Sequence, residues 1–178
     1  MRTAGVILAG GRSLRMGSPK ATLPWGATTL LAHVCAQVAE AVDGPLVGIL
    51  AGLVVLAEQA DAAYVSAVDM PRLRPAFVRR VLQGLDDAAD VALPEAHGHR
   101  HPLAAAYRTA LAGPLAAIVE AGGTRPAELY AVVRTRVIGP AWLLDDPALR
   151  ADDPALDSLL NVNDPEAYAA AHAAAFPA

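Results

Sequence analysis

The chain opens with a short apolar run that ends abruptly in glycine. Residues Ala4 to Ala9 carry no charge and do not alternate between polar and apolar side chains, and Gly10 and Gly11 follow at once. A continuous apolar run of this length is typical of a strand buried on both faces. Sheets with such strands are covered by helices on both sides, so this run predicts an α/β fold.

The rest of the chain alternates between strand and helix patterns. Apolar spacing and capping residues predict helices at 28–42, from Pro75 to about Leu85, at 111–121, and from Asp164 to about Ala175. Short apolar runs predict strands at 63–68, 91–93, 103–107 and 132–138. This alternation predicts a three-layer α/β fold in which a mostly parallel sheet is flanked by helices.

Composition narrows the class of protein. The 178 residues suit one domain covering 1–178, and with 54% hydrophobic residues they can bury a core. The net charge of −4 argues against general binding of nucleic acid. The uncharged, apolar stretch between Asp43 and Glu58 is 14 residues, short of the ~20 that span a bilayer. The single Cys35 cannot form an internal disulfide. We therefore expect a soluble, cytoplasmic protein that binds neither nucleic acid nor membrane.

Acidic residues are concentrated near the end of the chain. The wording Asp-Asp-Pro-Ala-Leu occurs at 145–149 and again at 152–156. Two copies are too few and too short for a structural repeat array. We expect residues 143–158 to form an acidic surface loop.

The loop after the first predicted strand has the composition of a phosphate site. In an open α/β sheet, ligands bind outside the carboxyl ends of the strands. Gly10 and Gly11 allow backbone N–H groups to approach an anion, and Arg15 and Lys20 add two cations. The spacing matches neither of the commoner phosphate loops. A tight turn with solvated charges remains the alternative.

Two further polar positions are candidates. Asp69 follows the strand predicted at 63–68 and can hold Mg²⁺ through its carboxylate, or else accept backbone hydrogen bonds in a turn. Asn161 and Asn163 point the same way in an extended segment and can bind a polar ligand. The alternative is that Asn163 or Asp164 caps the last helix.

Four segments, in order along nearly the whole chain, carry a resemblance. The first is Leu8-Ala9-Gly10-Gly11 with Arg15-Met16-Gly17 and Lys20; the others are Val68 to Pro71, His101 to Tyr107, and Leu160 to Glu166. They resemble the molybdenum cofactor guanylyltransferases of the nucleotidyltransferase superfamily. The resemblance implies a Rossmann-like nucleotidyltransferase fold and transfer of GMP from GTP to the phosphate of molybdopterin, with Mg²⁺ as cofactor and release of pyrophosphate. It also implies transient contact with other proteins of molybdenum cofactor synthesis, and a monomer or weak oligomer.

The resemblance also implies residue roles. Arg15, Lys20 and Asp69 are expected to be catalytic, with Asp69 as the metal ligand. The expected pterin contacts are Asn161, Asn163 and Arg125, although Arg125 fits a charge at a helix entry equally well. The expected nucleotide contacts are Leu8, Ala9, Gly10, Gly11, Lys20, Gly44, Pro45, Leu46 and Asp69.

The chain departs from the family pattern between Val42 and Gly44. Family members carry a second strand there, which contacts the guanine and ribose, and only Asp43 stands in its place. Residues 46–57 can be read as that strand, but their apolar spacing favours a helix. Either the sheet lacks one strand, or the sequence omits a segment that the native protein has. The departure keeps two alternatives open: a transferase using CTP or another phosphorylated acceptor, and an inactive accessory homologue. The intact glycine loop and Asp69 count against the inactive one.

Overall fold

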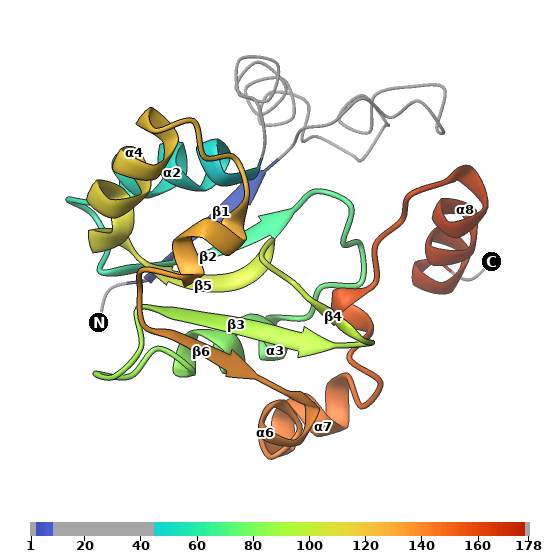
Figure 1. Cartoon of the computed structure of the whole chain (residues 1–178). Helices are drawn as coiled ribbons and strands as arrows, with labels where there is room; N and C mark the ends of the chain where they lie inside the picture. Colours follow the sequence, from blue (N-terminus) through green and yellow to red (C-terminus); the bar gives the residue numbers. More distant parts are fainter. Residues whose placement is uncertain (1–2, 9–44, 177–178) are drawn as a thin grey trace.

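A computed structural model describes residues 3–8 and 45–176 of the chain. Within these residues, six strands form one sheet, and helices lie against both of its faces (Figure 1). The strands are β1 (Thr3–Leu8), β2 (Ala62–Ala67), β3 (Val91–Ala96), β4 (His99–Arg100), β5 (Ala104–Arg108) and β6 (Thr135–Ile138).

Proline opens most of the described helices. Its fixed φ and missing N–H suit the first helical turn, and every helix below except α4 begins with it. The helices are α2 (Pro45–Leu56), α3 (Pro75–Gln83), α4 (Ala112–Glu120), α5 (Pro126–Tyr130), α6 (Pro140–Leu143), α7 (Pro147–Asp152) and α8 (Pro165–Ala175), with 3₁₀ turns η2 (Thr109–Leu111) and η3 (Asp157–Leu159). The helix predicted for 46–57 is confirmed as α2, whereas the one predicted at 28–42 lies outside the described residues.

The sheet is mixed. Its order is β1-β2-β5-β3-β4, and β6 pairs with β3. The pairs β1–β2 and β3–β6 are parallel, but β5 is antiparallel to both β2 and β3. The α/β class is confirmed, and the sheet is less parallel than expected. The reason is the connection from Ala96 to Ala104: it turns at His97-Gly98, where both residues have positive φ, and is too short for a parallel crossover of roughly a dozen residues.

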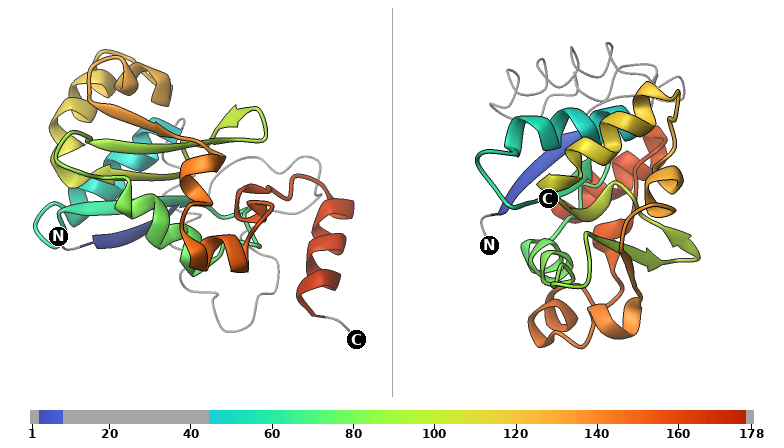
Figure 2. Two further views of the ribbon diagram at one scale, coloured as in Figure 1. Left: turned by 90° about the horizontal axis from the view of Figure 1, so that it is seen from below. Right: turned by 60° about the vertical axis from the view of Figure 1, so that its left-hand side comes forward.

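Two apolar layers enclose the sheet. Helices α2, α4 and α5 cover one face, and α3, α6 and α7 cover the other (Figure 2). Along β2, Ala62 and Tyr64 face the second layer, whereas Ala63 and Val65 face the first. All four are buried, as expected of a strand covered on both faces. Among the described residues, no helix is long and apolar enough to cross a membrane.

The expectation of an acidic surface loop at 143–158 is wrong. This segment contains α7 and η3, and Leu149 and Leu156 are buried in the core. The second aspartate of each Asp-Asp-Pro-Ala-Leu copy accepts backbone hydrogen bonds: Asp146 from Leu149 N at 2.8 Å, and Asp153 from two amides. Each copy is a turn with a capping aspartate and a buried leucine, so its acidity does not indicate solvation.

Candidate functional site

Two segments that the sequence singled out separately meet beyond the carboxyl end of β2. Asp69 lies in the turn after β2, and Asn161 lies in the extended segment before α8. Asn161 Nδ2 donates to Asp69 Oδ1 at 3.1 Å. Val162 N–H donates to the Asp69 carbonyl at 2.8 Å. A side-chain bond and a backbone bond therefore hold the two segments together.

The side chains of Asp69 and Asn161 both carry oxygen atoms that can bind a cation. A carboxylate only accepts hydrogen bonds, so the Asn161 amide must present its NH₂ group to Asp69, which directs its own oxygen elsewhere. Among the described residues, no group of three or more His, Cys, Asp and Glu side chains can hold a metal ion. Mg²⁺ does not need such a cage, because it is usually held by one or two carboxylates together with water and phosphate oxygens. Asp69 therefore fits the role of a magnesium ligand.

A small hollow adjoins Asn161. It has a volume of about 200 Å³, and its walls are Pro71, Arg72, Leu160, Asn161, Val162, Ala167, Ala170 and Ala171. The Arg72 guanidinium pairs with Asp157 at 2.8 Å. Sequence reasoning did not single out Arg72. The available signal was its place directly after Asp69-Met70-Pro71, where a cation falls beside the predicted metal ligand.

The residues after Asn161 lead into the last helix, and the helix cap is one of the two roles that the sequence left open. Asp164 Oδ1 accepts from Ala167 N at 2.8 Å, so Asp164 is the N-cap of α8. Asn163 is exposed.

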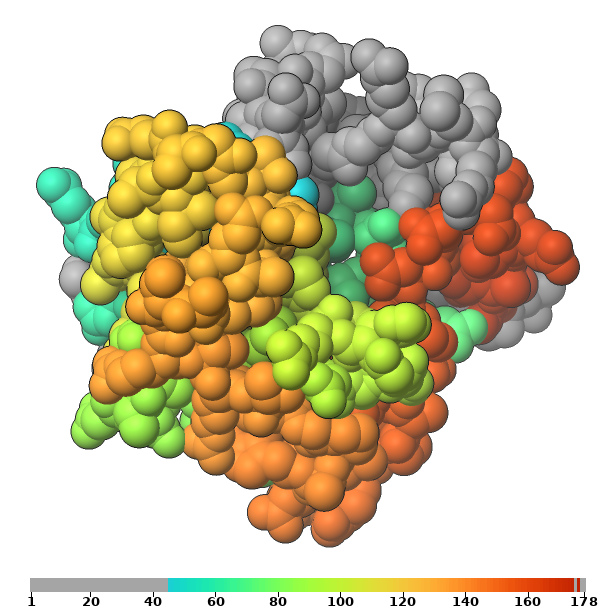
Figure 3. Space-filling view, viewed as in Figure 1, coloured from blue at the N-terminus to red at the C-terminus, as the bar shows by residue number. Residues whose placement is uncertain are grey.

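In the space-filling view, the green residues after β2 are set back between the red C-terminal segment and the yellow-green β3–β4 hairpin (Figure 3).

Arg125 is exposed at the start of α5, away from the Asp69–Asn161 contact. Its guanidinium pairs with Glu128 at 3.2 Å, and this hydrogen bond lowers the pKa of Glu128. Among the described contacts, none joins Arg125 to Asp69 or Asn161. The observed pairing is that of a charge at a helix entry.

The strand that precedes the predicted nucleotide loop ends beside β2. Leu8 ends β1 and pairs in register with Ala67, so the chain leaves both strands side by side. The remaining expected contacts of this loop lie outside the described residues: Ala9, Gly10, Gly11, Arg15, Lys20 and Gly44. Pro45 and Leu46 open α2, and the Leu46 side chain is fully buried in the core. Only the backbone of Leu46 is therefore suited to a nucleotide contact.

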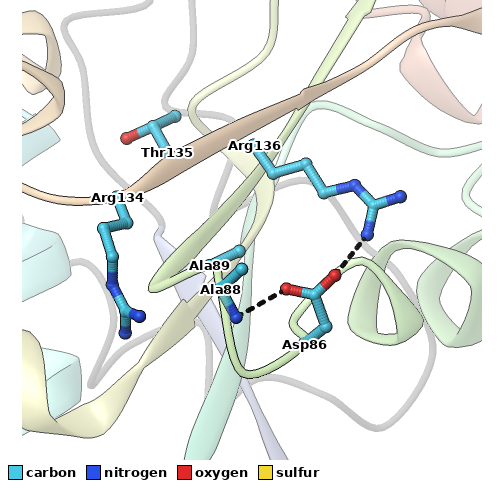
Figure 4. Close-up of a pocket in the computed structure, with 6 residues that line it drawn as sticks. All are labelled: Asp86, Ala88, Ala89, Arg134, Thr135 and Arg136. Atoms are coloured by element: carbon cyan, nitrogen blue, oxygen red, sulfur yellow. Dashed lines mark hydrogen bonds and ion pairs between the residues drawn. The ribbon is translucent and has the colours of Figure 1, made fainter.

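A second hollow lies at the opposite edge of the sheet. It has a volume of about 390 Å³ and is lined by Asp86, Ala88, Ala89, Arg134, Thr135 and Arg136 (Figure 4). Arg136 pairs with Asp86 at 2.8 Å, and Arg134 pairs with Asp90. Because these carboxylates neutralise both arginines, the hollow does not have the charge of a phosphate site.

Comparison with known proteins points to one family. The family model described as the MobA-like NTP transferase domain matches residues 5–44 and 39–135. A probable molybdenum cofactor guanylyltransferase of Mycobacterium avium is 37% identical over 156 residues, covering 70% of this chain and 78% of that protein. One from Chloroflexus aggregans is 30% identical over 200 residues, covering 93% and 91%. The molybdopterin-guanine dinucleotide biosynthesis protein A of Archaeoglobus fulgidus has the same fold, with a TM-score of 0.70, 20% identity, and coverage of 97% and 98%.

The comparisons also bear on the length of the chain. The alignment with the Chloroflexus protein spans 200 positions, more than the 178 residues available here, so part of that relative has no counterpart in this chain. The two stretches matched by the family model meet at 39–44, around the place where the sequence departs from the family pattern. The match nevertheless extends over most of the chain, and the resemblance inferred from the four segments is confirmed. The chain belongs to the MobA-like NTP transferase domain family.

Proposed function

We propose that this protein transfers GMP from GTP to the terminal phosphate of molybdopterin and releases pyrophosphate. The observation that carries the proposal is the contact between Asp69 and Asn161, because it joins the predicted metal ligand to the segment expected to meet the pterin. The curated relatives from Mycobacterium avium and Chloroflexus aggregans are both named as probable molybdenum cofactor guanylyltransferases, which supports the choice of nucleotide and acceptor.

The reaction needs little acid–base chemistry. An oxygen of the molybdopterin phosphate attacks the α-phosphorus of GTP, and a new P–O–P bond forms. The bond from the α-phosphorus to the oxygen that bridges to the β-phosphorus breaks, and pyrophosphate leaves with the electron pair. A phosphate monoester is already ionised near neutral pH, so no dedicated general base is required. The site must align the two phosphates and neutralise their charge.

The chain's own groups supply this alignment. Asp69 holds Mg²⁺, and Arg15 and Lys20 of the glycine loop meet the triphosphate. Mg²⁺, when bound, neutralises charge on the phosphate oxygens. Asn161 orients the Asp69 carboxylate, since its amide donates to one of the carboxylate oxygens.

The acceptor side has several polar groups. Asn161 and Asn163 face the pterin, and Arg125 is the arginine that the resemblance assigns to its phosphate. Arg72 lines the hollow beside Asn161, but Asp157 neutralises its guanidinium, so we assign it no contact with that phosphate. The pairing with Asp157 keeps the guanidinium in place at the wall of the hollow.

One experiment tests the proposal directly. Pyrophosphate release is measured with GTP, molybdopterin and Mg²⁺ for the wild type, Asp69→Ala and Lys20→Ala, with Asp145→Asn on the exposed surface as the control. Loss of a group that stabilises charge in the transition state costs about 10²–10³ in turnover. We expect that loss for Asp69→Ala and Lys20→Ala and none for Asp145→Asn. Wild-type turnover in either site variant would exclude the assignment.

A second candidate follows from the shorter chain. The segment expected to contact guanine is missing between Val42 and Gly44, so a transferase that uses CTP or another phosphorylated acceptor is the alternative. Pyrophosphate release with CTP or GTP as the only nucleotide in the same assay tests the choice of nucleotide. Faster release with CTP than with GTP would favour the alternative.

A further inference from the structure

A buried carboxylate precedes the segment that carries Asn161. Asp153 is 3% exposed. Its Oδ1 accepts from Asp157 N at 2.6 Å, and its Oδ2 accepts from Ser158 N at 3.0 Å. One carboxylate therefore fixes two consecutive backbone amides and sets the conformation of η3.

The η3 turn in turn holds the segment that follows Asp69. Ser158 Oγ accepts from Arg74 N at 3.0 Å and lies 3.5 Å from the Arg72 carbonyl. Asp157 pairs with the Arg72 guanidinium at 2.8 Å. These links connect the two residues fixed by Asp153 to the turn at 71–74, which begins two residues after Asp69.

The same segment also sets the position of Asn161. Leu159 is buried in the core at 2% exposure, which leaves little freedom to the residue pair that follows. Asn161 and Val162 then make the side-chain and backbone hydrogen bonds to Asp69. Residues of η3 and residues that follow it are therefore tied to Asp69 or to the turn directly after it.

We propose that Asp153 is a positioning residue for the metal site: it holds η3 so that Asn161 orients the Asp69 carboxylate. The inference rests on the proposed function in one respect, the role of Asp69 as the metal ligand. The role requires a carboxylate, because both of its oxygens accept from backbone N–H groups. An asparagine keeps the shape but has one accepting oxygen, and its NH₂ group would face an N–H donor.

The test compares Asp153→Asn with Asp152→Asn, which removes the same charge from an exposed neighbour. Binding of Mn²⁺ in the presence of GTP is titrated by electron paramagnetic resonance, well below the melting temperature of every variant. Residues that orient a metal ligand typically contribute 10–100-fold to metal affinity. We expect Asp153→Asn to weaken Mn²⁺ binding about tenfold and Asp152→Asn to leave it within twofold. We also expect saturating Mg²⁺ to restore most of the turnover of Asp153→Asn.

Two further variants make every outcome informative. Ser158→Ala removes the link to Arg74 and keeps Asp153. It tests the role of η3 if Asp153→Asn does not fold, and we expect it to weaken Mn²⁺ binding as Asp153→Asn does. Asp69→Asn tests the metal ligand itself. If Asp69→Asn loses Mn²⁺ and a folded Asp153→Asn binds it like the wild type, this inference is overturned and the proposed function stands. If Asp69→Asn also binds Mn²⁺ normally, the assignment of the metal ligand fails.

Discussion

Asn161 donates a hydrogen bond from Nδ2 to Oδ1 of Asp69 at 3.1 Å, although 92 residues separate the two in sequence. The resemblance assigns Asn161 to the pterin, and the structure places it on the carboxylate expected to hold the metal. A residue in this position acts on both sides of the reaction, since it orients the metal ligand and lines the hollow next to it.

Replacement of Asn161 by alanine should therefore change the metal dependence of turnover. Without the amide, the Asp69 carboxylate loses one of the groups that orient it, and the KM for Mg²⁺ is expected to rise about tenfold. Asn163→Ala is the comparison, because it removes the same kind of side chain two residues further along the same segment. We expect Asn163→Ala to change the KM for molybdopterin without changing the Mg²⁺ dependence. If Asn161→Ala also raises only the KM for molybdopterin, Asn161 does not orient Asp69.

Much of the fold could be predicted because local patterns decide it. Apolar runs marked the core strands, and a proline after a turn marked the starts of α3 and α8. The direction of β5 was harder to predict. It depends on the hairpin at His97-Gly98, whose positive φ values reverse the chain. A histidine in that conformation has no strong sequence signal.

The candidate site could be predicted only in part. Asp69 and Asn161 could each be nominated, because each stands at the end of a recognisable segment. Their contact depends on the packing of 153–159, where counting charges led to the wrong expectation. The useful signal there was the pattern Asp-Pro-Ala-Leu. Its aspartate caps the turn and its leucine is buried in the core.

Loss of the hydroxyl from two buried tyrosines on adjacent strands should change the free energy of unfolding in opposite directions. Tyr64 is 3% exposed, and its hydroxyl has no hydrogen-bond partner among the described residues. The Tyr107 hydroxyl donates to the Pro102 carbonyl at 2.8 Å, and the Tyr130 hydroxyl lies 2.9 Å from it. A buried polar group without a partner costs about 1–3 kcal/mol, and a hydrogen bond contributes about 1 kcal/mol.

We expect Tyr64→Phe to raise the free energy of unfolding by about 1 kcal/mol and Tyr107→Phe to lower it by about 1–2 kcal/mol. Urea denaturation of both variants measures the difference. Each change removes only the hydroxyl oxygen, so the two variants serve as controls for each other. Equal destabilisation in both would show that the Tyr64 hydroxyl has a partner.

Two glycines provide a matched test of packing. A Cβ at Gly84 would lie 2.8 Å from the Ala92 Cβ and 3.0 Å from the Val81 carbonyl oxygen, so strand β3 or helix α3 must shift. A Cβ at Gly113, in α4, would meet nothing within 4 Å. We expect Gly113→Ala to stabilise the protein by about 0.5–1 kcal/mol and Gly84→Ala to destabilise it by about 1–3 kcal/mol. Thermal unfolding measures both. An increase in melting temperature for Gly84→Ala would contradict the packing of α3 on β3.

The ion pair between Asp90 and Arg134 should make the free energy of unfolding depend on pH in the acidic range. Arg134 Nη2 lies 2.6 Å from Asp90 Oδ1, and Arg134 Nε donates to Oδ2 at 2.9 Å. This two-point hydrogen bond lowers the pKa of Asp90. A carboxyl group whose pKa is lower in the folded protein stabilises it fully above the ordinary aspartate value of ~3.9, and that contribution is lost as the pH falls through the folded pKa.

Asp90→Asn should therefore destabilise the protein at pH 7, and that effect should shrink as the pH falls below the ordinary aspartate value of ~3.9. At pH 7 the wild type has the ionised pair and the variant does not, whereas in acid the wild-type carboxyl group itself becomes protonated. The measurement is the difference in free energy of unfolding between wild type and Asp90→Asn by urea denaturation at several pH values. Asp145→Asn, at an exposed position, controls for loss of one negative charge. A difference for Asp90→Asn that stays constant from pH 7 to pH 3 would show that its cause is packing, because packing does not titrate in this range.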